Sequence, residues 1–334
     1  MGGDFWWVLV LKSAFLVLFL ATAFAYLTLA ERKVSARIQL RYGPNRVGPF
    51  GLLQPAADGI KLFFKENAGP SNRDRILFFV GPSLAGAAAM LAYAFIPLGT
   101  NSWFGYQFHW DITHANVGLL VILGVTSLGV YSLFLGGWSA NSKYSLLGGL
   151  RSSAQLISYE MAVAFALIGA VILAGSLDLE QIVGSQQHLW FIVLQPLAFI
   201  LYFIGAFAET NRLPFDLPEA ETELVGGYHT EYSSMRFGLY FLGEYVNMVT
   251  VCSIATALFL GGWLPLLPFH PFDWIPGPFW FLGKVIALLF IMMWVRWTLP
   301  RLRYDRLMNF GWKVLLPLGL LNIVITGAIV AVRA

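Results

Sequence analysis

Eight long apolar stretches divide this chain, and each is long enough to cross a membrane as a helix. A spanning helix needs about 20 mainly apolar residues, because each residue adds only ~1.5 Å across a hydrocarbon layer about 30 Å thick. The stretches that meet this requirement are residues 5–30, 76–98, 115–138, 154–174, 190–208, 237–263, 279–298 and 310–332. The pattern predicts an all-α fold, a polytopic membrane bundle of eight helices that forms a single integral membrane domain over residues 1–334.

Among the connections between these stretches, only alternate ones carry lysine or arginine. The first connection is the richest, with Arg32, Lys33, Arg37, Arg41, Arg46, Lys61, Lys65, Arg73 and Arg75. The third, fifth and seventh hold Lys143 and Arg151, Arg212 and Arg236, and Arg301, Arg303 and Arg306, whereas the second, fourth and sixth hold none. Because basic residues favour cytoplasmic loops, the odd connections, including residues 31–75 and 209–236, are predicted to be cytoplasmic and both termini periplasmic.

The first connection contains one further helical pattern. Residues 41–49, RYGPNRVGP, form a turn because glycine and proline interrupt any helix there. In the segment that follows, Leu53, Ala56, Ala57, Ile60 and Phe64 share one helical face, opposite Asp58, Lys61 and Lys65. This pattern predicts an amphipathic helix at the membrane surface. It serves either as a plain anchor or as the lip of a cavity that opens sideways to lipid.

Composition supports a membrane protein and argues against a resident cofactor. The chain is 58% hydrophobic and 12% charged, whereas soluble domains are about a quarter charged. A single cysteine, Cys252, excludes an internal disulfide, and the five histidines show no metal-ligand spacing. We therefore predict no iron–sulfur or other metal ligation by this chain, no covalently bound cofactor and no nucleic-acid partner.

Five of the charged residues inside the apolar stretches need an explanation. Lys12, Lys284 and Lys313 lie within about two turns of a stretch end, so we expect their side chains to reach the interface and assign them no role. Glu160 and Glu244 are predicted to lie roughly 10 Å below the cytoplasmic surface at ~1.5 Å per residue. An ionised carboxylate costs a few kcal/mol at such a site, which favours a functional role over a packing contact.

A dense acidic segment, residues 206–231, adjoins these two glutamates. It contains Glu209, Asp216, Glu219, Glu221, Glu223 and Glu231. Asp216 and Glu219 have the spacing of a capping box, so a helix is predicted to begin there. Apolar residues are interleaved with the acids, which argues against a freely solvated loop. If the segment folds into the mouth of the bundle, its carboxyl groups join Glu160 and Glu244 in a cluster that can bind and pass protons.

Four blocks of the sequence identify a family resemblance. They are AERKVSARIQLRYGPNRVGPFGLLQPAADGIKLFFKE, GWSANSKYSLLGGLRSSAQLISYE, AETNRLPFDLPEAETELVGGYHTEYSS and RLRYDRLMNFGWK. In this order they closely resemble the H subunit family of proton-pumping NADH:quinone oxidoreductase, respiratory complex I. Its mitochondrial member is the first NADH dehydrogenase subunit. The resemblance extends over nearly the whole chain.

The resemblance implies a substrate, partners and a location. Members of this family join the membrane arm of complex I to its peripheral arm and form the entrance and membrane-side wall of a quinone chamber. Quinone is the substrate, and its electrons come from an iron–sulfur cluster in a partner subunit. The implied partners are peripheral-arm quinone-site subunits on the cytoplasmic side, small membrane-arm subunits laterally, and membrane lipids. The implied location is the bacterial cytoplasmic (inner) membrane.

The resemblance also implies roles for individual residues. Those implied in quinone binding are Arg32, Asp58 and Lys61 at the chamber entrance, and Arg212, Phe215, Asp216 and Glu223 along its border. Those implied in proton transfer are Glu160, Glu209, Glu219, Glu221, Glu223, Glu244 and Tyr245. The chain has Ser127 where some relatives carry a glutamate and others a serine, which leaves the lateral end of the proton path open.

Three other interpretations remain at this point. A related subunit of a membrane-bound hydrogenase, or of another complex I–like enzyme, would share these motifs but differ in its electron donor or acceptor. A stand-alone proton-coupled carrier is compatible with buried acids, although such carriers usually contain two matching halves and the sequence has no such repeat. A purely structural anchor would tolerate replacement of its glutamates.

Overall fold

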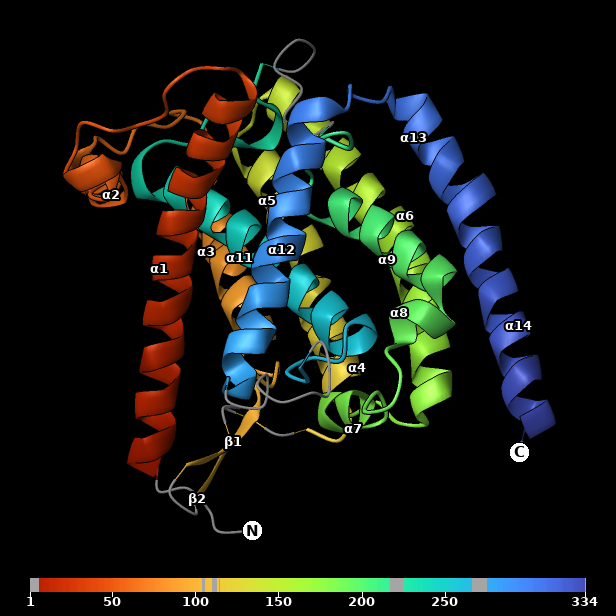
Figure 1. Ribbon diagram of the computed structural model, residues 1–334. Coiled ribbons are helices and arrows are strands. Elements are labelled where there is room, and N and C mark those ends of the chain that lie inside the picture. The colour runs from red at the N-terminus through yellow and green to blue at the C-terminus, as the bar shows by residue number, and fades with distance from the viewer. Residues whose placement is uncertain are drawn as a thin grey trace.

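The computed structural model describes residues 6–103, 106–109, 113, 115–216, 225–265 and 275–333. Within these residues nearly every element is a helix (Figure 1). The first part of the chain forms α1 (Trp6–Ile38), the short 3-10 turn η1 (Pro49–Gly51), α2 (Gln54–Phe64) and α3 (Leu77–Tyr93). A small antiparallel hairpin follows, β1 (Thr100–Trp103) and β2 (Tyr106–His109), in which Thr100 pairs with His109 and Trp103 with Tyr106.

The rest of the chain supplies the remaining helices of the bundle. The middle part forms α4 (Gly118–Thr126), α5 (Leu128–Ser139), α6 (Lys143–Ala174), α7 (Leu179–Gly184), α8 (Phe191–Leu194) and α9 (Pro196–Glu209). The last part forms η2 (Gly227–His229), α11 (Ser234–Phe259), α12 (Gly277–Thr298), α13 (Tyr304–Phe310), a π-helical turn η4 (Gly311–Leu315) and α14 (Leu316–Arg333). The hairpin is an addition to the predicted all-α fold.

Six of the described helical segments are long and apolar enough to cross a membrane. They are Trp6–Ile38, Gly118–Ser139, Lys143–Ala174, Ser234–Phe259, Gly277–Thr298 and Tyr304–Val332. Two shorter apolar helices, α3 and α9, coincide with the second and fifth predicted stretches. The structure is therefore a polytopic helical bundle, as the hydrophobic pattern predicts.

Helix ends differ from the predicted ends in two characteristic ways. α1 continues to Ile38 and α6 already begins at Lys143, because polar residues end an apolar stretch without ending a helix. Conversely, the fifth stretch divides at Gln195 into α8 and α9. Gln195 precedes a proline and has non-helical dihedrals, and its buried amide donates to the carbonyl of Gly169 at 3.2 Å and to Thr326 Oγ1 at 2.8 Å.

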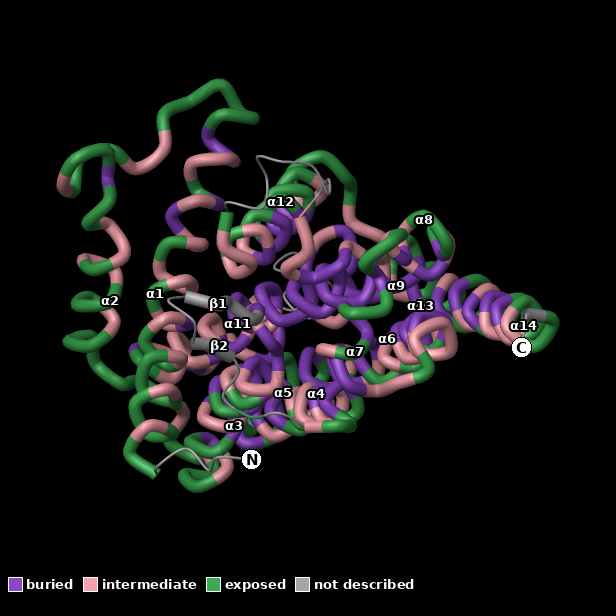
Figure 2. Tube along the Cα trace, turned by 60° about the horizontal axis from the view of Figure 1, so that its bottom comes forward, coloured by how far each residue is buried: buried purple, intermediate pink, exposed green. Residues whose placement is uncertain are grey.

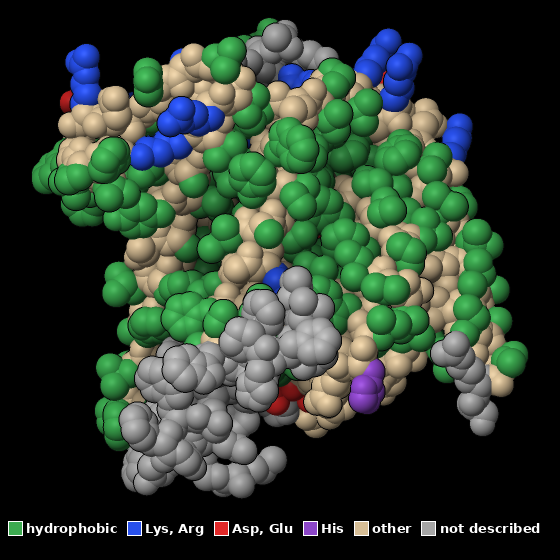
Figure 3. Space-filling view, viewed as in Figure 1, with side chains coloured by type: hydrophobic (Ala, Val, Ile, Leu, Met, Phe, Trp, Pro, Cys, Tyr) green, Lys and Arg blue, Asp and Glu red, His purple; other side chains and the backbone are tan. Residues whose placement is uncertain are grey.

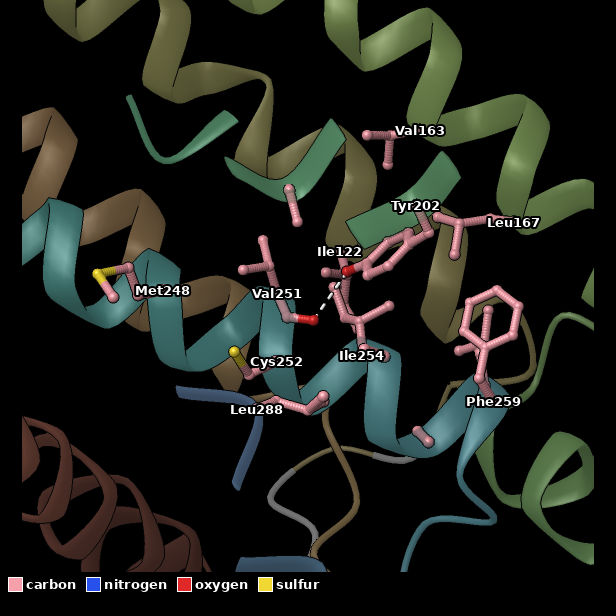
Figure 4. Packing of buried hydrophobic residues seen from close by; sticks show 14 of the residues in the cluster. Ile122, Val163, Leu167, Tyr202, Met248, Val251, Cys252, Ile254, Phe259 and Leu288 are labelled. Carbon is pink, nitrogen blue, oxygen red and sulfur yellow. Dashed lines mark hydrogen bonds between the residues drawn. The ribbon is translucent and has the colours of Figure 1, made fainter. Parts of the chain in front are cut away.

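The core lies around α11, most of whose residues are buried, whereas α1 with α2 and α14 lie at opposite edges (Figure 2). α11 packs against α3, α9 and α12, and α6 packs against α5, α9 and α14. Between α9 and α11 the Tyr202 hydroxyl donates to the Val251 carbonyl at 2.8 Å (Figure 4). A Cβ on Gly243 would meet the backbone of Ala85 at 3.1 Å, so glycine permits the close approach of α3 and α11.

Lys284 does not behave as the sequence predicts. It is buried, and its ammonium group donates to the carbonyls of Leu260, Gly262 and Leu264 at 2.7, 2.9 and 2.7 Å. It also lies over the Trp190 ring, 4.3 Å from its centroid. The expectation that this side chain reaches the interface was wrong, because carbonyls at the end of α11 lie within reach and a cation there complements the helix dipole.

Candidate functional site

Three of the predicted proton-transfer residues line one cavity. Glu160 comes from the middle of α6, Glu209 from the last turn of α9 and Glu244 from the third turn of α11. Together they border a cavity of about 80 Å³, which we call the inner cavity. Asn247 and Tyr240 also line it, so its wall offers an amide and a phenol besides the carboxyl groups. Most of the wall is apolar, but these polar groups can hold a few water molecules in a cavity of this size.

Ser127 lies at the edge of the inner cavity, where it separates α4 from α5. Its hydroxyl group lies within hydrogen-bond distance of the Glu160 carboxylate and of the Leu123 carbonyl, 2.9 Å away. Ser127, which the sequence left open as the lateral end of the proton path, therefore contacts a glutamate in this chain.

Arg212 connects two buried carboxylates. Its Nε lies 2.5 Å from Glu244 Oε1, and its Nη1 lies 3.2 Å from Glu31 Oε1. The guanidinium stacks over the Tyr245 ring at 4.3 Å, and the Tyr245 hydroxyl donates to Glu31 Oε2 at 2.6 Å. Burial alone would lower the pKa of Arg212, but Glu244 and Glu31 raise this pKa above its ordinary value. Arg212 is therefore a permanent cation between two acids.

Glu244, Arg212, Glu31 and Arg296 form one ion cluster. A second cavity lies beyond it. It measures about 650 Å³ and is called the outer cavity here; its lining includes Asp216, His229, Phe237, Phe241, Arg296 and Arg301. Arg301 pairs with Asp216 at 3.1 Å, and Arg296 pairs with Glu31. An unbroken series of ionic contacts therefore runs from Glu244 on the inner cavity through Arg212 and Glu31 to Arg296 on the outer cavity.

The outer cavity combines aromatic rings with polar groups. The His229 ring lies edge-to-face against Phe237 and Phe241, at centroid distances of 5.4 and 6.3 Å. Burial lowers the pKa of His229 to about 4, so its imidazole is neutral near pH 7. A wall of aromatic rings, neutral imidazole and guanidinium groups is suited to a flat, weakly polar ring with hydrogen-bond acceptors.

Phe215 lies away from the outer cavity. It is buried against Tyr159, at a centroid distance of 5.5 Å. Its carbonyl accepts a hydrogen bond at 2.8 Å from Gln155 Nε2, which also lies 3.0 Å from the Ala208 carbonyl. Gln155 of α6 therefore fixes the segment after α9 that carries Arg212 and Asp216.

Arg32, Asp58 and Lys61 are also brought together, on α1 and α2. Asp58 Oδ2 lies 2.7 Å from Arg32 Nη1, and Asp58 Oδ1 lies 3.1 Å from Lys61 Nζ. Burial acts to raise the pKa of Asp58, but the two cations hold it below its ordinary value. This cluster fixes α2 against α1 and stays partly open to solvent.

Three predicted site residues, Glu219, Glu221 and Glu223, lie outside the described residues, as does the helix predicted to begin after Asp216.

Sequence reasoning missed Glu31, Arg296 and Arg301 as members of the site. Glu31 follows the first apolar stretch directly and was grouped with the loop, and Arg296 lies near the end of the seventh. The signal that could have identified them is their charge at the membrane boundary, where a partner is needed.

Within the described part of the chain, no group of three or more His, Cys, Asp or Glu could hold a metal ion.

Comparison with known proteins decides the family. The sequence model described as NADH dehydrogenase matches residues 11–327, nearly the whole chain. The chain belongs to the NADH dehydrogenase family. One relative is an H subunit (number 1) of the NADH-quinone oxidoreductase of Geobacter metallireducens, 51% identical over 323 residues, or 96% of each chain. Another is the H subunit of the same kind of enzyme from Rhodospirillum rubrum. It is 48% identical over 331 residues, which covers 97% of this chain and 96% of the relative.

Proposed function

We propose that this NADH dehydrogenase family member is the H-type membrane subunit of a proton-translocating NADH:quinone oxidoreductase. It borders a quinone-binding cavity and couples quinone reduction to proton movement through buried carboxyl groups. The observation that carries the proposal is the series of ionic contacts between the two cavities, from Glu244 to Arg296. The relatives are named as quinone oxidoreductase subunits, and these names give no support to a hydrogenase subunit or a stand-alone carrier.

The outer cavity is the proposed contact with quinone. Reduction of a quinone to a quinol takes up two electrons and two protons, and the electrons come from a partner subunit. The chain supplies aromatic surface from Phe237 and Phe241 and hydrogen-bond donors from Arg296 and Arg301. Asp216 holds Arg301 in place. Arg32, Asp58 and Lys61 border the proposed entrance, and Glu223 completes the proposed border.

The ion cluster is the proposed coupling element. Charge that arrives or leaves near Arg296 changes the electrostatic potential at Glu31. Arg212, which pairs with Glu31, transmits this change to Glu244. Two unit charges about 4 Å apart interact by roughly 4 kcal/mol at an effective dielectric of 20. A change of that size alters a proton-binding equilibrium by about three powers of ten, which is enough to load or unload a carboxyl group.

The inner cavity is the proposed start of the proton path in the membrane. Glu209, Glu160 and Glu244 line one small cavity, so a proton can pass between them through water held there. Tyr245 steadies Glu31 at the entrance of this path. Glu219, Glu221 and Glu223 are proposed to feed it from the acidic segment that precedes η2.

A photoreactive quinone analogue tests the outer cavity. In the assembled complex we expect illumination to label the segments 225–241 and 296–301, because both line the outer cavity. Excess unlabelled quinone should reduce the labelling, which peptide mass spectrometry would measure. The segment 176–185, which includes α7, serves as an internal control. Equal labelling of this control segment, or labelling that spares both cavity segments, would contradict the proposal.

We further propose that α3 and α9 cross the bilayer, which gives eight spans within one membrane domain. α3 has 17 residues, about 26 Å at 1.5 Å per residue, close to the hydrocarbon thickness. The odd connections then face the cytoplasm, both termini face the periplasm, and α2 lies on the cytoplasmic surface of the inner membrane. Peripheral-arm subunits would bind on that side and small membrane-arm subunits laterally.

Cysteine accessibility tests this topology. In a Cys252→Ala background, a membrane-impermeant maleimide should label His188→Cys in cells with a permeabilised outer membrane. It should label Lys65→Cys only in inverted vesicles. Both positions are exposed, and Cys252 is buried. If labelling places residues 65 and 188 on one side of the membrane, the proposed number of spans between them is wrong.

A further inference from the structure

We propose that the groove between α1 and α12 binds an anionic phospholipid of the surrounding bilayer, whose headgroup phosphate contacts Lys33 and Arg37. The groove measures about 470 Å³ and is lined by Lys33, Val34, Arg37, Ile38, Phe290 and Trp294. Among the described residues, it shares no lining residue with the inner or the outer cavity. It lies at the Ile38 end of α1, on the proposed cytoplasmic side.

The floor of the groove is suited to an acyl chain. Ile38, Phe290 and Trp294 present 41%, 49% and 56% of their surfaces, so apolar area remains uncovered there. Contiguous apolar surface at this depth is stabilised by lipid hydrocarbon rather than by water. Trp294 also places an indole ring near the proposed interface, where tryptophan is enriched in membrane proteins.

The rim of the groove is suited to a phosphate. Lys33 and Arg37 are four residues apart on α1 and share one face of the helix. Lys33 Nζ donates to the Phe50 carbonyl, which leaves two of its three N–H groups for other acceptors. In the part of the chain that the structure describes, Arg37 has no carboxylate partner. An arginine guanidinium binds two phosphate oxygens at once.

Neighbouring cations on the same two helices, unlike Arg37, pair with carboxylates. Arg32 pairs with Asp58, and Arg296 pairs with Glu31. Lysine and arginine side chains gather along one edge of the molecule, above a broad hydrophobic surface (Figure 3). Basic residues at such an edge attract anionic lipids of the cytoplasmic leaflet. The apolar floor makes a lipid, rather than free phosphate, the ligand that satisfies both parts of the groove.

A bound lipid would hold a weakly packed helix in place. α1 has few buried residues, and its contact with α12 includes the Glu31–Arg296 ion pair of the functional site. A lipid in the groove would contact both helices within two turns of this pair.

Photoreactive lipids test the proposal in the assembled complex. The complex is reconstituted in phosphatidylcholine vesicles that contain either phosphatidylglycerol or phosphatidylcholine with a diazirine on one acyl chain. The phosphatidylglycerol probe should label residues 34–38 and 290–294 more strongly than the phosphatidylcholine probe. Combining Lys33→Gln with Arg37→Gln should reduce this labelling about 25-fold, since a basic residue near an anionic surface contributes about 1 kcal/mol, or about fivefold.

Three controls keep the test decisive. Arg306→Gln removes an exposed arginine from α13 and should leave the labelling unchanged. Arg37→Lys keeps the charge and should retain most of it, whereas Val34→Trp should block the floor and reduce it. Comparing the two probes on the unaltered complex does not depend on any variant folding. Equal labelling by both probes, no labelling of the groove, or full labelling of the double variant would overturn the proposal.

Discussion

Replacing Arg212 by glutamine is expected to abolish coupled quinone reductase activity and to lower the amount of assembled subunit at least about tenfold. The change leaves Glu31 and Glu244 buried without the cation between them. Removing one partner of a buried ion pair costs about 3–5 kcal/mol, which is a large share of the stability of most domains. The measurements are NADH:quinone activity in membranes and the amount of complex on a native gel.

Matched variants separate charge from geometry at this site. Arg212→Lys keeps the charge but cannot contact both carboxylates with one planar group, so we expect assembly to recover more than activity. Combining Arg212→Gln with Glu244→Gln removes both charges of one pair and should restore part of the assembly without restoring proton pumping. Arg303→Gln disrupts an exposed pair with Asp305, worth about 0–1 kcal/mol, and should change neither. Normal pumping in Arg212→Gln would contradict the coupling role.

Replacing Glu160 or Glu244 by glutamine is expected to lower proton pumping by at least about tenfold. Glutamine fits the same space but cannot bind and release a proton. Positioned proton-transfer groups commonly contribute about 10²–10⁴-fold to rate. Glu160→Gln is the more informative variant, because its contact with Ser127 can survive the change and assembly should be normal. Glu244→Gln also weakens the ion cluster and should affect assembly as well.

The measurements for this second prediction are acidification by inverted vesicles and quinone reductase rate, both scaled to the amount of complex. Because the two processes are coupled, both should fall together. Glu66→Gln, an exposed carboxyl group outside both cavities, serves as the matched control and should retain both rates. Full pumping in both Glu160→Gln and Glu244→Gln would exclude the relay through the inner cavity.

Much of the site was predictable because local rules determine it. Hydrophobic length placed Glu160 and Glu244 inside helices, and the end of the fifth stretch placed Glu209 at a helix terminus. These three residues line one cavity in the structure. The pattern could not reveal Glu31 as a partner of Arg212, since the two residues are 181 positions apart in the chain. Such a contact is set by how helices pack, which hydrophobic periodicity does not encode.

The sequence predicted where helices occur better than where they end or are interrupted, for a related reason. Apolarity reports where a segment meets lipid, whereas a helix ends where backbone geometry or a side-chain partner favours another conformation. Gln195 interrupts an apolar stretch because its buried amide has partners on α6 and α14. Lys284 is buried for a similar reason, since three carbonyls compensate its ammonium group. Both outcomes depend on groups that come from distant parts of the chain.

The position of Lys284 has a consequence for the direction of proton travel. Glu244 lies in the third turn of α11, and the ammonium group of Lys284 lies beyond the carboxyl end of this helix. A hydrogen ion that moved along α11 from the carboxyl groups would approach a fixed like charge whose hydrogen-bonding capacity is already taken up by carbonyls. Repulsion of this kind disfavours a direct exit along α11, so we expect protons collected here to leave sideways, into whichever membrane protein adjoins it.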